Sequence, residues 1–108
     1  MSDRRQDKLQ EAIREQAARF VTTESDRTSL ITVTHVVVST DLKSGIVFFT
    51  VYPEAKEAVV LEFLNRKRKH FRDELMSKLS LRRIPRCEFR IDSGEKNRQR
   101  IDTVLSQE

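Results

Sequence analysis

Lysine and arginine side chains are concentrated in one stretch of this 108-residue chain, and their type and spacing indicate a binding chemistry. Residues 61–90 carry ten of them against four carboxylates, whereas the rest of the chain holds slightly more acid than base. Such cations neutralise phosphate groups, and arginine does so through two parallel hydrogen bonds. The candidate residues for binding the phosphate groups of a polyanion are Arg66, Lys67, Arg68, Lys69, Arg72, Lys78, Arg82, Arg83 and Arg86. From charge alone, a basic helix face that contacts only water explains the stretch equally well.

The other reactive side chains do not suggest a catalytic or metal-binding set. Cys87 shares the alternation of Phe89 and Ile91, so its thiol is predicted to be buried, whereas a nucleophilic cysteine must be accessible. His35 lies among valines and is predicted to be a packed structural residue. His70 fits an exposed helix surface better than a base-stacking site, and no His or Cys pair has metal-ligand spacing. We therefore expect no enzyme, no metal and no other cofactor.

Periodicity in the first half of the chain predicts a helix followed by a β-hairpin. Apolar residues recur every three or four positions over residues 7–20, which is the period of an amphipathic helix. A polar loop is expected at 22–29, and β-branched residues then indicate strands at 30–39 and 46–52 around a turn at 40–45. Tyr52, at the end of the second strand, is the aromatic residue best placed for an exposed contact.

The second half predicts two helical segments, a third strand and a final helix. Pro53 is suited to the start of a helix, and the apolar stripe that follows is interrupted at residues 65–70. Two short helices, or one kinked helix, would explain the interruption. Alternation over residues 87–92 indicates a half-buried strand with a charged outer face. Ser93 can cap a last helix with the apolar stripe Ile101, Val104 and Leu105.

Length and composition favour one domain, residues 1–108, of the α+β class. A three-stranded sheet with helices on one face is expected, because each amphipathic helix needs an apolar sheet face to cover. The single cysteine permits no intrachain disulfide, which is typical of the reducing cytoplasm. Apolar runs of at most four residues predict no membrane segment. Two glycines in the whole chain argue against a glycine-rich dinucleotide site.

Several short stretches, in this order, resemble bacterial ribosome-binding factor A. The similarity extends from about residue 9 to residue 105. It is carried by Ile31-Thr32-Val33-Thr34-His35-Val36, Val38-Ser39-Thr40-Asp41-Leu42, Val47, Leu81-Arg82-Arg83-Ile84-Pro85, Phe89, Asp92-Ser93, Arg100-Ile101-Asp102 and Val104-Leu105. The resemblance implies a KH type II fold with the order α-β-β-α-α-β and a C-terminal helix.

The resemblance also implies a function and partners. A chain of this family would be a non-catalytic assembly factor that binds the free or immature 30S small ribosomal subunit through its 16S rRNA. It would assist late maturation and processing of that rRNA, including its 5′ region. We expect a monomer when the chain is free, located in the cytoplasm and without membrane contact.

One departure from the resembled family concerns glycine. KH domains clamp the nucleic-acid backbone with a glycine-rich loop between two helices, and ribosome-binding factor A usually keeps Ala-x-Gly there. The corresponding positions are Lys67, Arg68 and Lys69, and no glycine occurs between Gly45 and Gly94. Because glycine permits close backbone approach, RNA binding here is predicted to depend on side-chain charge. The absence of glycine also leaves open whether the helix pair is kinked.

Two alternatives of other kinds remain at this point. One is a protein interaction module whose sheet edge or basic face binds an acidic protein partner. The other is a KH-like protein that binds a different RNA, and only the family resemblance separates it from the ribosomal assignment.

Overall fold

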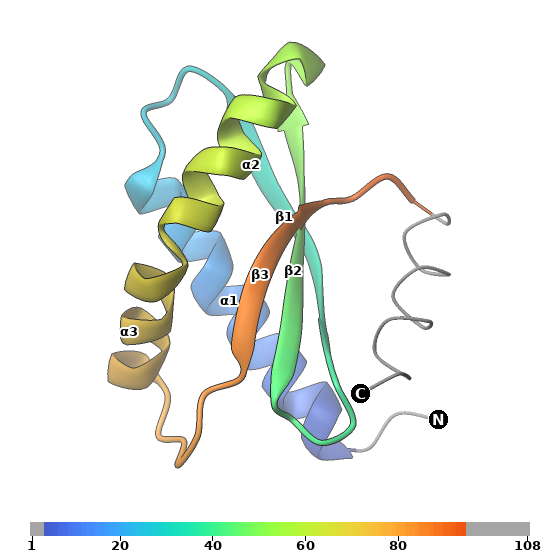
Figure 1. Cartoon of the computed structure of the whole chain (residues 1–108), viewed down its shortest axis with the longest axis vertical. Helices are drawn as coiled ribbons and strands as arrows, with labels where there is room; N and C mark the ends of the chain where they lie inside the picture. Colours follow the sequence, from blue (N-terminus) through green and yellow to red (C-terminus); the bar gives the residue numbers. More distant parts are fainter. Residues whose placement is uncertain (1–3, 95–108) are drawn as a thin grey trace.

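The helices and strands of the described residues follow one another in the order that the sequence predicts. The computed structural model describes residues 4–94. Along this part of the chain the elements are α1 (Arg4–Glu24), β1 (Leu30–Val38), β2 (Ser44–Tyr52), the short 3-10 helix η1 (Glu54–Lys56), α2 (Glu57–Arg66), α3 (Arg68–Lys78) and β3 (Arg86–Ile91) (Figure 1). The C-terminal helix expected at Ile101, Val104 and Leu105 falls outside the described residues, and Ser93, its expected cap, is exposed.

The sheet has β2 at its centre. β1 pairs with β2 in antiparallel fashion, from Leu30 opposite Tyr52 to Val38 opposite Gly45, which confirms the predicted hairpin. β3 runs parallel to β2 on the other side, starting with Arg86 opposite Ser44. A parallel neighbour requires a crossover connection, and α2 and α3 supply it. As a consequence, β3 begins beside the turn that joins β1 to β2.

A bulge in β1 explains why its apolar residues change parity. The register of β1 against β2 shifts between Val33 and His35, so one extra residue is inserted there. Val33 before the bulge and Val36 after it are therefore both buried in the main core. Val37 packs against a smaller cluster on the opposite face of the sheet, which contains the buried β2 residues Ile46 and Phe48. Towards its end, β1 therefore contributes apolar residues to both faces of the sheet.

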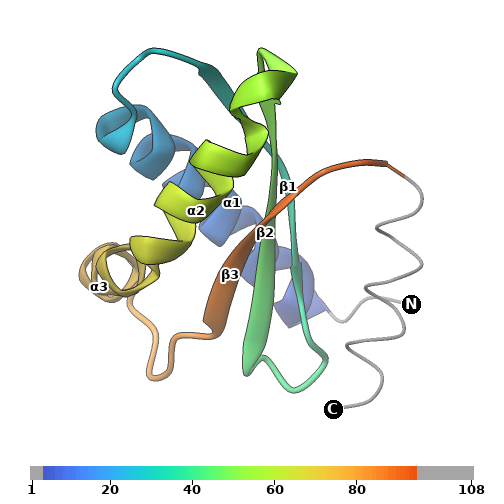
Figure 2. The ribbon, with the colours of Figure 1, turned by 45° about the horizontal axis from the view of Figure 1, so that its top comes forward.

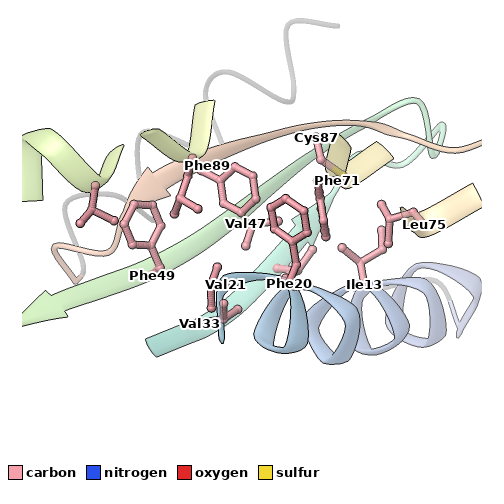
Figure 3. Close-up of a cluster of buried hydrophobic side chains, with 14 of the residues drawn as sticks. Ile13, Phe20, Val21, Val33, Val47, Phe49, Phe71, Leu75, Cys87 and Phe89 are labelled. Atoms are coloured by element: carbon pink, nitrogen blue, oxygen red, sulfur yellow. The ribbon is translucent and has the colours of Figure 1, made fainter. Parts of the chain in front are cut away.

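The helices cover one face of the sheet (Figures 1 and 2), and the main core lies between the helices and that face. At its centre the Phe20 ring of α1 lies 5.1 Å from the Phe71 ring of α3 and 6.4 Å from the Phe89 ring of β3. Figure 3 shows these rings together with Ile13 and Leu75. Each such side chain contributes about 1.5–3 kcal/mol by leaving water, so this cluster fixes α1 and α3 against the sheet.

The interruption in the helical stripe is a true break between two helices. α2 ends at Arg66 and α3 begins at Arg68, with Lys67 between them at φ −96° and ψ 9°. The Lys67 N–H donates to the Leu64 carbonyl (3.0 Å), and the Lys67 carbonyl accepts from the Phe71 N–H (2.9 Å). Because the φ of Lys67 is negative, the position does not require glycine, and the break forms with a lysine there.

Several element boundaries differ from those predicted, and α1 already begins at Arg4. The first helix continues to Glu24 instead of ending before Thr22, and the Ser25 N–H still donates to the Val21 carbonyl (3.0 Å) in its last turn. β2 begins two residues early, at Ser44. Pro53 precedes η1, so the segment after it enters α2 through a 3-10 turn.

Side-chain amides from the helices bind both outer edges of the sheet. On β1, the Gln6 amide donates to the Val38 carbonyl (3.0 Å), and Gln10 Oε1 accepts from the Val38 N–H (3.0 Å). On β3, the Asn65 amide donates to the Phe89 carbonyl (3.3 Å), and Asn65 Oδ1 accepts from the Phe89 N–H (3.2 Å). These bonds satisfy backbone groups that no neighbouring strand of the described sheet reaches.

Candidate nucleic-acid interface

A groove lined mainly by cations lies between the β1–β2 turn, the start of β3 and α3. Figure 1 shows these three segments at its lower end. The volume of the groove is about 860 Å³. We call it the basic groove, and its lining residues are Asp41, Lys43, Ser44, Arg68, Lys69, Arg72, Arg83, Ile84, Arg86 and Cys87. Six of these side chains are cationic and one is a carboxylate, so the groove attracts anions.

Three of the cations come from one side of α3. Arg68 and Arg72 are four positions apart, and Lys69 is three before Arg72, so their side chains share a helix face. The Arg68 guanidinium also donates through Nε to the Asn65 carbonyl (3.2 Å), which holds it at the helix break. Because the Asn65 amide binds β3, the break places this helix face at a fixed distance from the strand.

The opposite wall of the groove is formed by the turn and by the entry to β3. The Arg86 N–H donates to the Lys43 carbonyl (2.8 Å), which ties the strand to the turn. Gly45 lies beside Cys87, and a Cβ on Gly45 would stand only 3.1 Å from the Cys87 sulfur. Glycine therefore allows β2 and β3 to approach closely here, and this brings Lys43 next to Arg86.

Asp41 is the negative charge in the groove, and it has a structural role in the turn. Its Oδ1 accepts from the Ser39 hydroxyl (2.6 Å) and from the Lys43 N–H (3.0 Å). Both bonds lower the pKa of Asp41 below its usual value, and the bond from Ser39 has the larger effect. The carboxylate is thus ionised at neutral pH and fixes the shape of the turn that presents Lys43.

The structure separates the nine predicted phosphate-binding residues into two sets. Five of them line the basic groove, namely Arg68, Lys69, Arg72, Arg83 and Arg86. Arg66 points elsewhere and pairs with Glu62 (3.1 Å). The half-buried Lys67 places its ammonium 5.8 Å from the centre of the Phe63 ring. Lys78 and Arg82 are exposed but do not line the groove.

Sequence reasoning missed the contribution of the turn. Lys43, Asp41 and Ser44 line the groove although they are far along the chain from its other charged residues. Their position in a hairpin turn was visible in the sequence. It would have indicated that they join the groove only if the parallel pairing of β3 with β2 had been known, since this pairing brings the turn to Arg86.

The remaining singled-out side chains take part in packing. Cys87 is buried at 8% exposure, as predicted, and burial raises the pKa of its thiol to about 12. The His35 ring stacks on Phe48 with centroids 4.6 Å apart, as expected for a structural histidine. The His70 ring meets Phe20 edge-on, and its Nδ1 lies 3.4 Å from a Glu24 carboxylate oxygen.

Residues 4–94 contain neither a metal-binding cluster nor a membrane-spanning helix. No three His, Cys, Asp or Glu side chains in this part of the chain come together in a way that could hold a metal ion. None of the helices described there combines the length and the apolar character that crossing a membrane requires.

Comparison with known proteins gives consistent similarities. The family model of ribosome-binding factor A matches residues 5–105. Ribosome-binding factor A of Koribacter versatilis is 35% identical over 102 residues, which cover 92% of this chain and 83% of the relative. The crystal structure of the Thermus thermophilus factor superposes with a TM-score of 0.70 at 26% identity, covering 80% of this chain and 94% of that one. A homology model of the Thermus thermophilus factor, fitted into the cryo-electron microscopy map of its 30S complex, gives 0.69 at 26% identity, over 77% and 90%.

Proposed function

The chain belongs to the ribosome-binding factor A family, and from this premise we propose that it binds the free or immature small ribosomal subunit in the cytoplasm. It does so through 16S rRNA and assists late maturation and processing of that rRNA without catalysing a reaction. The similarity to a Thermus thermophilus factor that was fitted into a 30S complex supports this partner.

The observation that carries the proposal is the basic groove. Six cations from three separate segments converge on it, and the carboxylate among its lining residues is engaged in shaping the turn. A solvated helix face would spread its charges around α3, whereas here the turn and the entry to β3 add cations to the same hollow. This convergence is what binding of several phosphates along an RNA backbone requires.

The mechanism that follows is selective binding. Contacts with phosphates give affinity and orientation but carry little sequence information, so recognition depends on the shape of the rRNA. A protein that binds one rRNA conformation more tightly than another shifts the population towards it. Of the positions that correspond to the glycine clamp, Arg68 and Lys69 line the groove, so RNA is expected to be held by long side chains that extend from the start of α3.

A pair of matched triple variants tests the site. Replacing Arg68, Lys69 and Arg72 by Gln removes three charges from the groove. Replacing Arg66, Lys67 and Lys78 by Gln removes three charges from α2, the helix break and α3, all outside the groove. Each phosphate contact contributes about 0.7–0.9 to the slope of log affinity against log salt concentration. The loss of three contacts should therefore weaken co-sedimentation of the groove variant with free small subunits on the order of 100-fold at about 0.15 M salt. The control variant should stay within a few-fold of wild type.

Equal losses in the two variants would show that overall charge, and not the groove, drives binding. Repeating the titration with protein-free 16S rRNA separates an RNA partner from an acidic protein partner. If only intact subunits bind, and binding still depends on the groove, the groove meets a ribosomal protein and the rRNA part of the proposal is wrong.

The maturation role is tested in cells that depend on this protein. Cells that carry the groove variant should accumulate 16S rRNA with unprocessed 5′ ends, detected by primer extension, while the control variant restores normal ends. Normal 5′ ends in cells whose only copy is the groove variant would contradict a role in processing.

A further inference from the structure

A second hollow lies at the other end of the β-hairpin, where β1 begins and β2 ends. Its volume is about 500 Å³. We call it the Tyr52 hollow, and it is lined by the end of α1, the loop to β1 and the residues Leu30, Ile31, Tyr52 and Pro53. The end of β2 and the loop that leads to β1 lie at the upper end of Figure 1, opposite the β1–β2 turn. Ser44 and Tyr52 are eight residues apart in β2, which corresponds to about 26 Å.

Two large side chains with apolar surface are left in solvent at this hollow. Tyr52 is 74% exposed and Leu30 is 67% exposed. They are direct partners across the antiparallel pair, so their side chains are neighbours. An aromatic ring gains free energy when a partner covers it, so an exposed tyrosine beside an exposed leucine offers a platform for a flat ligand.

The loop beside the hollow holds an arginine in an unusual backbone conformation. Arg27 has φ 68°, in the left-handed region that costs an L-residue roughly 1–2 kcal/mol. Two local bonds maintain it, because Ser25 Oγ accepts from the Arg27 N–H (3.1 Å) and Asp26 Oδ1 accepts from the Thr28 N–H (3.0 Å). Strained residues that local bonds enforce in this way are frequent at binding sites.

The chemistry of the lining favours one kind of occupant. Among the described residues that line it, Arg27 alone is charged, and Thr22, Ser25, Thr28 and Ser29 add hydroxyl groups to an otherwise apolar surface. A neighbouring hollow across the same loop differs, because Glu24 and Asp26 line it. This lining suits a nucleobase with its phosphate. The aromatic ring can stack on the base, the cation and the hydroxyl groups can bind the phosphate, and no carboxylate among the described lining residues would repel it.

We infer that the Tyr52 hollow binds an unpaired nucleobase of single-stranded RNA, stacked on Tyr52, with Arg27 at the adjoining phosphate. This inference rests on the proposed function, since it adds a second rRNA contact to that of the basic groove. The two contacts are about 26 Å apart, so they bind different nucleotides and should contribute independently.

The tyrosine itself provides the first measurement. Tyr52 is the only tyrosine of the chain, and there is no tryptophan, so the intrinsic emission reports on this hollow alone. Adding an oligoadenylate of about eight nucleotides should quench the emission as the base stacks. The Arg27→Gln variant should require several-fold more RNA for the same quenching, and the groove triple variant should still be quenched. Unchanged emission of the wild-type protein up to millimolar oligoadenylate would overturn the inference.

Subunit binding provides the second measurement. Tyr52→Ala should weaken binding to free small subunits by roughly 5- to 150-fold, the range for loss of one base stack. Tyr52→Phe keeps the ring and should bind within about twofold of wild type. The ring is exposed, so neither variant should change the melting temperature appreciably. The salt dependence of binding should be the same in Tyr52→Ala as in wild type, because no phosphate contact is removed.

The outcomes distinguish this inference from the proposed function. If Tyr52→Ala binds subunits normally while the groove variant does not, the inference is wrong and the groove assignment stands. If only Tyr52→Ala is impaired, the groove assignment fails. If Tyr52→Ala is impaired but RNA does not quench the tyrosine, the hollow meets a ribosomal protein, and the RNA occupant is wrong.

Discussion

At the scale of single residues, Asn65 connects the helix break to the sheet. Its side-chain amide makes two bonds to the Phe89 backbone, while its own carbonyl accepts from the Arg68 guanidinium. One half-buried side chain therefore closes the outer edge of β3 and places the first groove cation. An asparagine at a helix end is common, so nothing in the local sequence marks this role.

Asn65→Ala is expected to lower the free energy of unfolding by about 1–3 kcal/mol, because the Phe89 N–H and carbonyl lose their partners. Urea denaturation measures the change. Gln10→Ala, which removes one bond from the other sheet edge, should cost less. A stability loss for Asn65→Ala no larger than that of Gln10→Ala would show that water replaces the amide without penalty.

Cys87 is predicted to make stability depend on alkaline pH. Its folded pKa of about 12 lies above the usual value of 9.0 because the thiol is buried. Between these two values the unfolded chain loses the thiol proton and the folded protein keeps it. The free energy of unfolding should therefore be unaffected below about pH 9 and fall above it, by about 1.4 kcal/mol per pH unit.

Urea denaturation of wild type and Cys87→Ala at about pH 8, 9.5 and 10.5 isolates this effect, since all other titrating groups are shared. The wild-type advantage should shrink as the pH rises. An advantage that stays constant over this range would mean that the thiol ionises equally in both states.

At the scale of elements, the helix break shows that a kink does not need the glycine that the resembled family uses. Lys67 lies at a negative φ, and the bonds around it are those of two helices that meet end to end. The interruption of the apolar stripe at residues 65–70 predicted either two short helices or one kinked helix, and the structure shows two helices.

Lys67→Gly tests whether the break is free of strain. Glycine would relieve no strain and would add freedom to the unfolded chain, so the melting temperature should fall, consistent with a loss of about 0.5–1 kcal/mol. Lys67→Ala serves as the control and should be nearly neutral. A rise in melting temperature for Lys67→Gly would indicate that the lysine backbone is strained after all.

At the scale of the whole molecule, the two ends of the hairpin differ in chemistry. The basic groove gathers six cations at the turn, whereas the opposite end exposes an aromatic ring and one arginine. The net charge of +4 therefore understates the local field at the groove. Binding driven by that field must weaken as counterions compete for the phosphates.

The affinity for protein-free 16S rRNA is expected to fall with salt at a logarithmic slope of roughly −3.5 to −4.5, if about five groove cations meet phosphates. Titrations between about 0.05 and 0.3 M KCl measure it. The groove triple variant should reduce the slope by about 2 to 3, and the matched triple variant outside the groove should leave it unchanged. A slope near zero for wild type would remove the electrostatic basis of the proposed function.

The sequence alone determined the types of the elements, the antiparallel hairpin, the burial of Cys87 and the location of the charge. These features depend on periods of two or about 3.6 residues and on turns, which are local properties. It did not determine which cations share a surface. Arg66 and Arg68 are two positions apart, yet the break at Lys67 sends only Arg68 into the groove.

The tertiary structure decided the site. Parallel pairing of β3 with β2 brings Lys43 to Arg86, and the Asn65 bonds bring α3 to the same place. Such pairings depend on which apolar faces fit together across the whole chain, and many registers share the same local pattern. The sequence thus shows which charged residues are present, while long-range packing decides which of them line one groove.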